Sequence, residues 1–172
     1  MYRKFLLLFI CITGNSHSLL SQLKITDSLH NLLVSHGKVD TVRVDLLNDL
    51  AYELRRNNPG ATDSLIRIAI DVAGKLNYKK GKGFALAIQG SRFYAQVKYK
   101  SADSVFAISK QLLETGKDYR NMAFLLRSMA NMEMDEGDYA ASLDNFLRIN
   151  QGAKIRRYKT SCRNSAVHWI PL

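Results

Sequence analysis

This sequence has few of the residues that build chemical sites. It contains two cysteines and four histidines among 172 residues. Cys11 lies in an apolar segment near the amino terminus, so removal of that segment leaves Cys162 as the only cysteine and excludes an intramolecular disulfide. His30 and His36 are six residues apart, which would put them on different sides of a helix as a poor metal pair. No histidine lies near a suitable nucleophile, and we predict a protein that is not an enzyme and has no metal or cofactor.

Long apolar runs are also scarce, and the one that occurs lies at the amino terminus. A short basic segment is followed by an apolar run from Phe5 to Ile12 and then by small residues at Ser16 and Ser18. This order predicts a signal peptide over residues 1–21 and an exported protein, periplasmic or secreted. The run is shorter than the roughly 20 residues that cross a bilayer as a helix, so a permanent anchor is the weaker alternative. No comparable run follows, and we expect no membrane span after signal removal.

The formal charge of +10 is unevenly distributed along the chain. Two basic residues lie in the signal segment, and five basic residues with no acid follow Asn150. Residues 19–150 hold 18 basic and 15 acidic residues, so this part is only mildly basic. No basic stripe with interleaved aromatic residues runs along one helix face, and we therefore expect no nucleic-acid partner.

The sequence repeats its own pattern at an offset of 40 residues. An earlier stretch matches one residue out of register, and the slip falls in the connection at residues 57–60, where a length change costs little. A period of this length predicts a solenoid whose units each bury a face only against a neighbour. The corresponding pairs are Leu86 and Leu126, Gly90 and Ala130, Tyr99 and Tyr139, Ala102 and Ser142, and Phe106 and Phe146.

Each unit is predicted to be a pair of antiparallel helices. Apolar or small residues with helical spacing occupy residues 62–76, 102–113, 125–132 and 139–147. The short polar turns between them favour helical hairpins. Those turns are predicted at residues 57–60, 78–81, 98–100, 115–118 and 136–138.

Ahead of the repeats, residues 22–37 are predicted to form an N-terminal capping helix. Thr26 or Asp27 is the expected N-cap, and Gly37 is expected to end the helix. Its narrow apolar face suits a helix that covers the first repeat.

The segment from Gly137 to Phe146, with Ala130 ahead of it, resembles the tetratricopeptide repeat signature. In that signature small residues on the two helices of a unit face each other beside aromatic side chains. A second copy has the same set of residues, Gly90, Phe93, Tyr99, Ala102 and Phe106. We expect Gly90 and Ala102 to let two backbones approach closely while the rings fill the adjacent volume.

The resemblance covers residues 40–150, about three units, and implies an all-α solenoid that binds proteins or peptides. The sequence departs from the family in its period, which is 40 rather than the usual 34 or so. Glu133 also stands where an aromatic residue is expected, and Pro59-Gly60 replaces the turn tyrosine in the first unit.

The long period, the signal and the phrases Asp40–Arg43 and Leu76–Gly81 are similar to the exported repeat arrays of bacterial sensor histidine kinases and related regulators. In those proteins a transmembrane helix and a cytoplasmic kinase follow the repeats. Here no apolar span, kinase-like histidine helix or glycine-rich nucleotide loop follows. Two alternatives are therefore open: a free-standing binding scaffold, and a truncated periplasmic sensor portion active in signal transduction.

After Ile149 the helical pattern ends, and residues 151–172 are predicted to be an irregular basic tail. A premature or frame-altered terminus, a disordered tail and a tail that binds anionic surfaces are the alternatives. Repeat arrays need a polar capping helix at each end, and none is found at this one. We therefore expect marginal stability or self-association through the uncovered last helix.

In arrays of this kind the first helix of each unit lines the concave side, so the resemblance places the ligand there. Arg127 and Asn131 are four residues apart and share a helix face, where they can hold a peptide carboxylate or backbone. The alternative is that these positions are ordinary solvated residues, as we expect for the acidic cluster at residues 133–138. The candidate peptide-binding residues are Asn48, Tyr52, Arg55, Ser91, Tyr94, Arg127 and Asn131.

Overall fold

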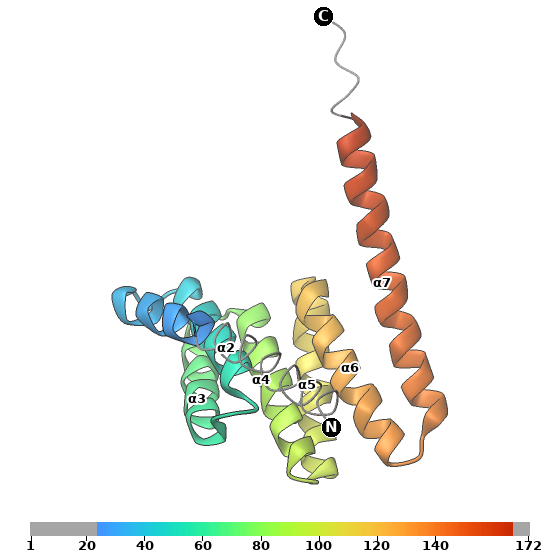
Figure 1. The fold of residues 1–172 in the computed structure, drawn as a ribbon, viewed down its shortest axis with the longest axis horizontal. Helices are drawn as coiled ribbons and strands as arrows, with labels where there is room; N and C mark the ends of the chain where they lie inside the picture. Colours follow the sequence, from blue (N-terminus) through green and yellow to red (C-terminus); the bar gives the residue numbers. More distant parts are fainter. Residues whose placement is uncertain (1–23, 167–172) are drawn as a thin grey trace, which may run out of the picture. The chain divides into compact units, whose positions relative to one another are not determined.

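The computed structural model describes the backbone of residues 24–166 and the side chains of residues 24–152. The predicted signal peptide lies outside the described residues. A helix covers residues 24–35, and no strand occurs between residues 24 and 166, which confirms the all-α class (Figure 1). The helices that follow are α2 (Thr41–Leu54), α3 (Pro59–Lys75), α4 (Lys79–Ala95), α5 (Tyr99–Gly116), α6 (Tyr119–Asp135) and α7 (Tyr139–Ala166).

The described residues fall into two compact units. The chain passes from the first unit to the second between Gly81 and Lys82, inside the first turn of α4. The first unit holds the helix at residues 24–35 together with α2 and α3, and α2 packs against α3. The second unit holds most of α4 and the three helices that follow it.

Short polar side chains begin most of these helices. Each accepts a hydrogen bond from a backbone N–H of the first turn, which otherwise has no partner inside the helix. The bonds run from Arg43 to Asp40 (3.0 Å), from Ala61 to Asn58 (3.1 Å), from Asn121 to Asp118 (3.2 Å) and from Ala141 to Asp138 (3.1 Å).

Four helices end in the same way, and the positive-φ residues that follow them repeat at the 40-residue period. A residue with positive φ follows each helix, and the next N–H bonds back to the last turn of the helix, as in a Schellman motif. The positive-φ residues are Asn77 (50°) and Lys117 (55°) after α3 and α5, and Val97 (61°) and Gly137 (85°) after α4 and α6. The returning bonds are Tyr78 to Ala73 (2.8 Å), Lys98 to Phe93 (2.9 Å), Asp118 to Leu113 (3.0 Å) and Asp138 to Glu133 (2.8 Å).

The connection after α2 is different. It runs from residue 55 to residue 58, one residue longer than the connections at 96–98 and 136–138. The place agrees with the one-residue slip that the sequence predicted, but the direction does not, because the sequence match makes the first unit one residue shorter across this connection. All five predicted turns lie at or beside an observed helix connection.

The buried faces of α3 and α5 also match at the 40-residue offset. In both helices the predicted stripe is centred on four buried side chains, and this confirms the helical spacing inferred from the sequence. They are Thr62, Ile66, Ala69 and Ala73 in α3, and Ala102, Phe106, Ser109 and Leu113 in α5.

In the second unit α4 and α5 form an antiparallel hairpin. The hydroxyl of Ser109 donates a hydrogen bond of 2.7 Å to the carbonyl of Gly83, near the start of α4. Towards the end of α4, a Cβ on Gly90 would lie 2.4 Å from the ring of Phe106. Gly90 therefore makes room for this ring, as the sequence predicted for the close approach of the two helices.

The next hairpin, α6 with α7, packs beside the first, and α6 runs parallel to α4. At the start of α4 and α6 the rings of Phe84 and Phe124, 40 residues apart, meet edge to face at 5.8 Å. At their other ends the Tyr94 hydroxyl donates to Asp135. Corresponding helices of neighbouring repeats therefore lie side by side, and the second unit has a helical repeat-like fold.

Two predicted boundaries are wrong. Residues 24 and 25 are already helical, so neither Thr26 nor Asp27 is an N-cap, although the helix does end at Ser35, just before Gly37. At the other end α7 continues to Ala166, and residues 151–166 are helical rather than irregular. Extending an existing helix needs no apolar period, and the lysines and arginines of this segment have good helix propensity. Residues 167–172 lie outside the described part.

Candidate functional site

Asn48 is not available to a ligand. Its side chain is 1% exposed, and its amide donates a hydrogen bond of 2.9 Å to the carbonyl of Gly81. The prediction that Asn48 points to solvent is therefore wrong. It failed because the amide serves the junction between α2 and the start of α4, a role that helical spacing does not reveal.

The side chains of Tyr52 and Arg55 contact each other at the end of α2. The guanidinium carbon of Arg55 lies 3.6 Å from the centre of the Tyr52 ring, and Arg55 also donates to the Tyr52 carbonyl. Both side chains are half-buried. This is a cation–π pair inside one helix, which fixes the arginine against the ring.

The other four candidates belong to the second unit, and Ser91 is the least suited of them to bind a ligand. It lies on α4, is half-buried, and donates its hydroxyl to the Ile88 carbonyl at 2.7 Å. The hydroxyl thus bonds within its own helix, as serine commonly does.

Tyr94 is tied to α6 through its hydroxyl. The hydroxyl donates to a carboxylate oxygen of Asp135 at 2.5 Å, and the Tyr94 ring lies 6.2 Å from that of Tyr99. The hydrogen bond to Asp135, aided by partial burial, raises the pKa of Tyr94 to about 12, because the ionised phenolate would lose the bond and face a negative charge. Asp135 was predicted to be a solvated turn residue, and the structure instead makes it a partner of a candidate residue.

Arg127 and Asn131 share the open side of α6. Arg127 is exposed, with its guanidinium carbon 5.8 Å from the Phe124 ring centre, and Asn131 is half-buried. Asp135 follows after a further four residues, so the three side chains form one row along the helix. Sequence reasoning found the first two and missed Asp135, although its four-residue spacing was visible.

Glu133, the departure from the family pattern, has a structural role. Both of its carboxylate oxygens accept from the Asn145 amide, at 3.0 and 2.8 Å, and Asn145 is buried on α7. A polar pair thus joins α6 to α7 where an aromatic ring was expected. The sequence offered one sign of this pair, because a polar residue, Asn145, occurs within the otherwise apolar pattern of the next helix.

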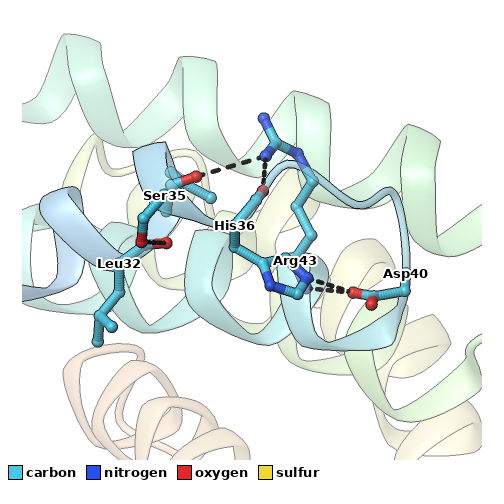
Figure 2. Close-up of polar contacts among 6 residues, drawn as sticks. Leu32, Ser35, His36, Asp40 and Arg43 are labelled. Atoms are coloured by element: carbon cyan, nitrogen blue, oxygen red, sulfur yellow. Dashed lines mark hydrogen bonds and ion pairs between the residues drawn. The ribbon is translucent and has the colours of Figure 1, made fainter.

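A second polar cluster joins the helix at residues 24–35 to α2. Figure 2 shows Asp40 between the imidazole of His36 and the start of α2, with Arg43 reaching back over the end of the preceding helix. His36 Nε2 lies 2.8 Å from Asp40, and Arg43 donates to the His36 carbonyl at 2.8 Å. The hydrogen bonds from His36 and then from the Arg43 backbone N–H hold the pKa of Asp40 below its usual value.

This cluster does not converge on a cavity. A shallow hollow follows the outer side of the same helix, and its walls come from that helix alone. It is lined by Lys24, Asp27, Ser28, Asn31, Leu32 and Ser35.

Two further searches cover the described chain only. Among the described side chains, those of residues 24–152, there is no cluster of three or more histidine, cysteine, aspartate or glutamate residues arranged to hold a metal ion. Between residues 24 and 166, no helix combines the length and the apolar character that crossing a bilayer requires.

Comparison with known proteins gives no family assignment. No protein-family model matches the chain, and neither the curated proteins nor the solved structures compared with it include a significant match.

Proposed function

We propose that this protein is an exported, non-catalytic scaffold of tetratricopeptide-like repeats that binds an extended peptide along the open side of α4 and α6. The observation that carries the proposal is the row of Arg127, Asn131 and Asp135 on α6, beside the Tyr94 ring of α4. Charged and amide side chains can pair with the backbone and the terminal carboxylate of an extended peptide, and two parallel helices held side by side present them on one surface.

The row has a length that suits a short peptide. Four residues of α-helix rise about 6 Å, so Arg127 and Asp135 are separated by about 12 Å along α6. An extended peptide covers that distance in about four residues. Arg127 suits a carboxylate or a backbone carbonyl, Asn131 suits a peptide amide, and Asp135 suits a peptide N–H or a cationic side chain.

The repeat-like packing of the second unit supports the assignment to a binding scaffold. Phe84 with Phe124, and Tyr94 with Asp135, hold α4 and α6 in fixed register. Side chains on a helix held in this way lose little further freedom when a ligand binds, which favours affinity. Export remains a proposal that rests on the amino-terminal sequence pattern alone.

The test is selection of linear peptides from a random display library on the purified protein. We expect Arg127→Ala to weaken binding of the selected peptides by about tenfold or more, the cost of a lost charge-assisted hydrogen bond. Helicity by circular dichroism is expected to be unchanged, because Arg127 is exposed.

Lys100→Ala is the matched control, because Lys100 is an exposed cation of the same unit on α5. It is expected to leave peptide affinity unchanged. If no peptide is enriched, the proposed function is wrong; if peptides bind equally well to both variants, Arg127 is not part of the site.

A further inference from the structure

The outward side of α7 carries an apolar strip that the fold does not cover. We call Tyr139, Leu143, Phe146 and Leu147 the α7 strip; their side chains are 70, 60, 39 and 49% exposed. The spacing puts all four on one helix face. The buried residues of α7, Ser142 and Asn145, lie on another side.

Stacking of a further repeat would not account for the whole strip. On α5 the residue that corresponds to Phe146 is Phe106, which is fully buried in the repeat packing. The residues that correspond to Leu143 and Leu147 are Asp103 and Ala107, which stay exposed although α6 and α7 follow α5. A repeat added in the same way would leave both leucines in water. They therefore indicate a different contact, along the outward side of α7.

The two ends of α7 carry opposite charges. Glu136 and Asp138 are exposed in the turn that precedes the helix. In the sequence, Lys154, Arg156 and Arg157 occupy later turns of the same helix, with no acid after Asp144. Sixteen residues of helix separate Asp138 from Lys154, about 24 Å. That exceeds the screening length of about 8 Å at physiological salt, so the two ends cannot pair within one straight helix.

We propose that the α7 strip is covered by the α7 strip of a second copy of this chain, with the two helices antiparallel. In this arrangement the basic end of each helix lies beside the acidic turn of the other copy, and the leucines are buried between these two contacts. A parallel pair would bring acid to acid and base to base. The interface is the same patch on both copies, so it closes as a two-fold dimer.

The first test is the mass of the full chain as a function of concentration, by sedimentation equilibrium. The variant Leu143→Asp with Leu147→Ala carries the residues that α5 has at these positions. It is expected to fold with unchanged helicity. Its dimer is expected to be weaker by about tenfold or more, because each copy loses two leucines that the interface buries. Ile108→Ala is the control, because Ile108 is also exposed (51%) but lies on α5 outside the strip, and it is expected to leave the dimer unchanged.

The second test is a charge exchange, which separates a specific antiparallel pair from general hydrophobic association. Glu136→Arg and Arg157→Glu, made singly, are each expected to weaken the dimer about threefold to tenfold, since each change acts twice in a two-fold interface. Arg157 is chosen because it follows Phe146 by eleven residues, about three helical turns, and so belongs to the strip's face of the helix. The double variant restores opposite charges and is expected to recover most of the affinity. A chain that stays monomeric at all concentrations, or a double variant weaker than both single variants, would overturn the proposal.

Discussion

At the scale of single residues, the backbone carries one conspicuous mismatch. Val97 has a φ of 61°, in the left-handed region that costs a β-branched residue more than any other kind. The residue 40 positions later, in the corresponding turn, is Gly137, which adopts this region without steric cost. The two turns thus share one geometry, and only one of them has the residue suited to it.

Val97→Gly is therefore expected to stabilise the protein by about 0.5–1 kcal/mol, since the relief of strain exceeds the entropy that glycine adds to the unfolded chain. Val97 is 70% exposed, so little packing is lost. Urea unfolding followed by circular dichroism measures the change. The reverse substitution, Gly137→Val, should destabilise by a similar or larger amount; equal stabilities of all three proteins would show that the turn carries no strain.

A second residue-scale prediction concerns the titration of Tyr94, whose pKa is raised to about 12 by its hydrogen bond to Asp135. Because the folded pKa lies above the unfolded value of about 10, the stabilisation from this bond is complete below pH 10. It is lost as pH rises through about 12. Asp135→Asn is expected to lower the pKa of Tyr94 towards its ordinary value.

An ultraviolet titration of tyrosinate measures this change. Tyr94→Phe identifies the step that belongs to Tyr94, because that step should be missing from the curve of the variant. The assignment fails if Asp135→Asn leaves the high-pH step where it is.

At the scale of helices, Gly90 marks the closest contact of the α4–α5 hairpin. Glycine inside a helix normally costs about 1 kcal/mol relative to alanine. Here a Cβ would lie 2.4 Å from the Phe106 ring, a side chain with no exposed surface into which to move. Gly90→Ala is therefore expected to destabilise by about 1–3 kcal/mol, as overpacking does.

Gly74→Ala is the matched control, because Gly74 also lies inside a helix but has nothing within 4 Å of its added Cβ. It is expected to stabilise by up to about 1 kcal/mol through helix propensity alone. The opposite signs of the two changes, read from thermal or urea unfolding, test the packing argument. Stabilisation by both would show that the ring moves aside at little cost.

The helices and their connections were largely predictable from the sequence, because spacing and turn residues act locally. The stripes of α3 and α5 and all five turns follow from such patterns. The roles of individual polar groups did not follow. Asn48 looks like a surface residue until its bond to Gly81, 33 positions away, is seen, and Asp135 looks like a turn residue until Tyr94 reaches it. Such bonds depend on which residues, far apart in the sequence, the tertiary structure brings together.

At the scale of the whole molecule, the 40-residue repeat in the sequence shows which residues each hairpin must bury. It does not show how many hairpins belong to one compact unit. Residues 40–150 were predicted as one repeat domain, whereas the described chain divides between Gly81 and Lys82. The irregular spacing lies in the first unit, where the connection after α2 is one residue longer than its counterparts.

The recurring helix endings have a consequence for how such a protein grows. Each returning hydrogen bond joins a turn to the helix just before it, so the turn geometry is set within its own segment. Residues 79–118 contain the turn that ends α4, the turn that ends α5 and Asp118, which caps the next helix. A second copy of this segment inserted after Asp118 would therefore carry all three features with it. Duplication or deletion of a segment of this length can therefore lengthen or shorten the chain while every remaining turn keeps its returning hydrogen bond.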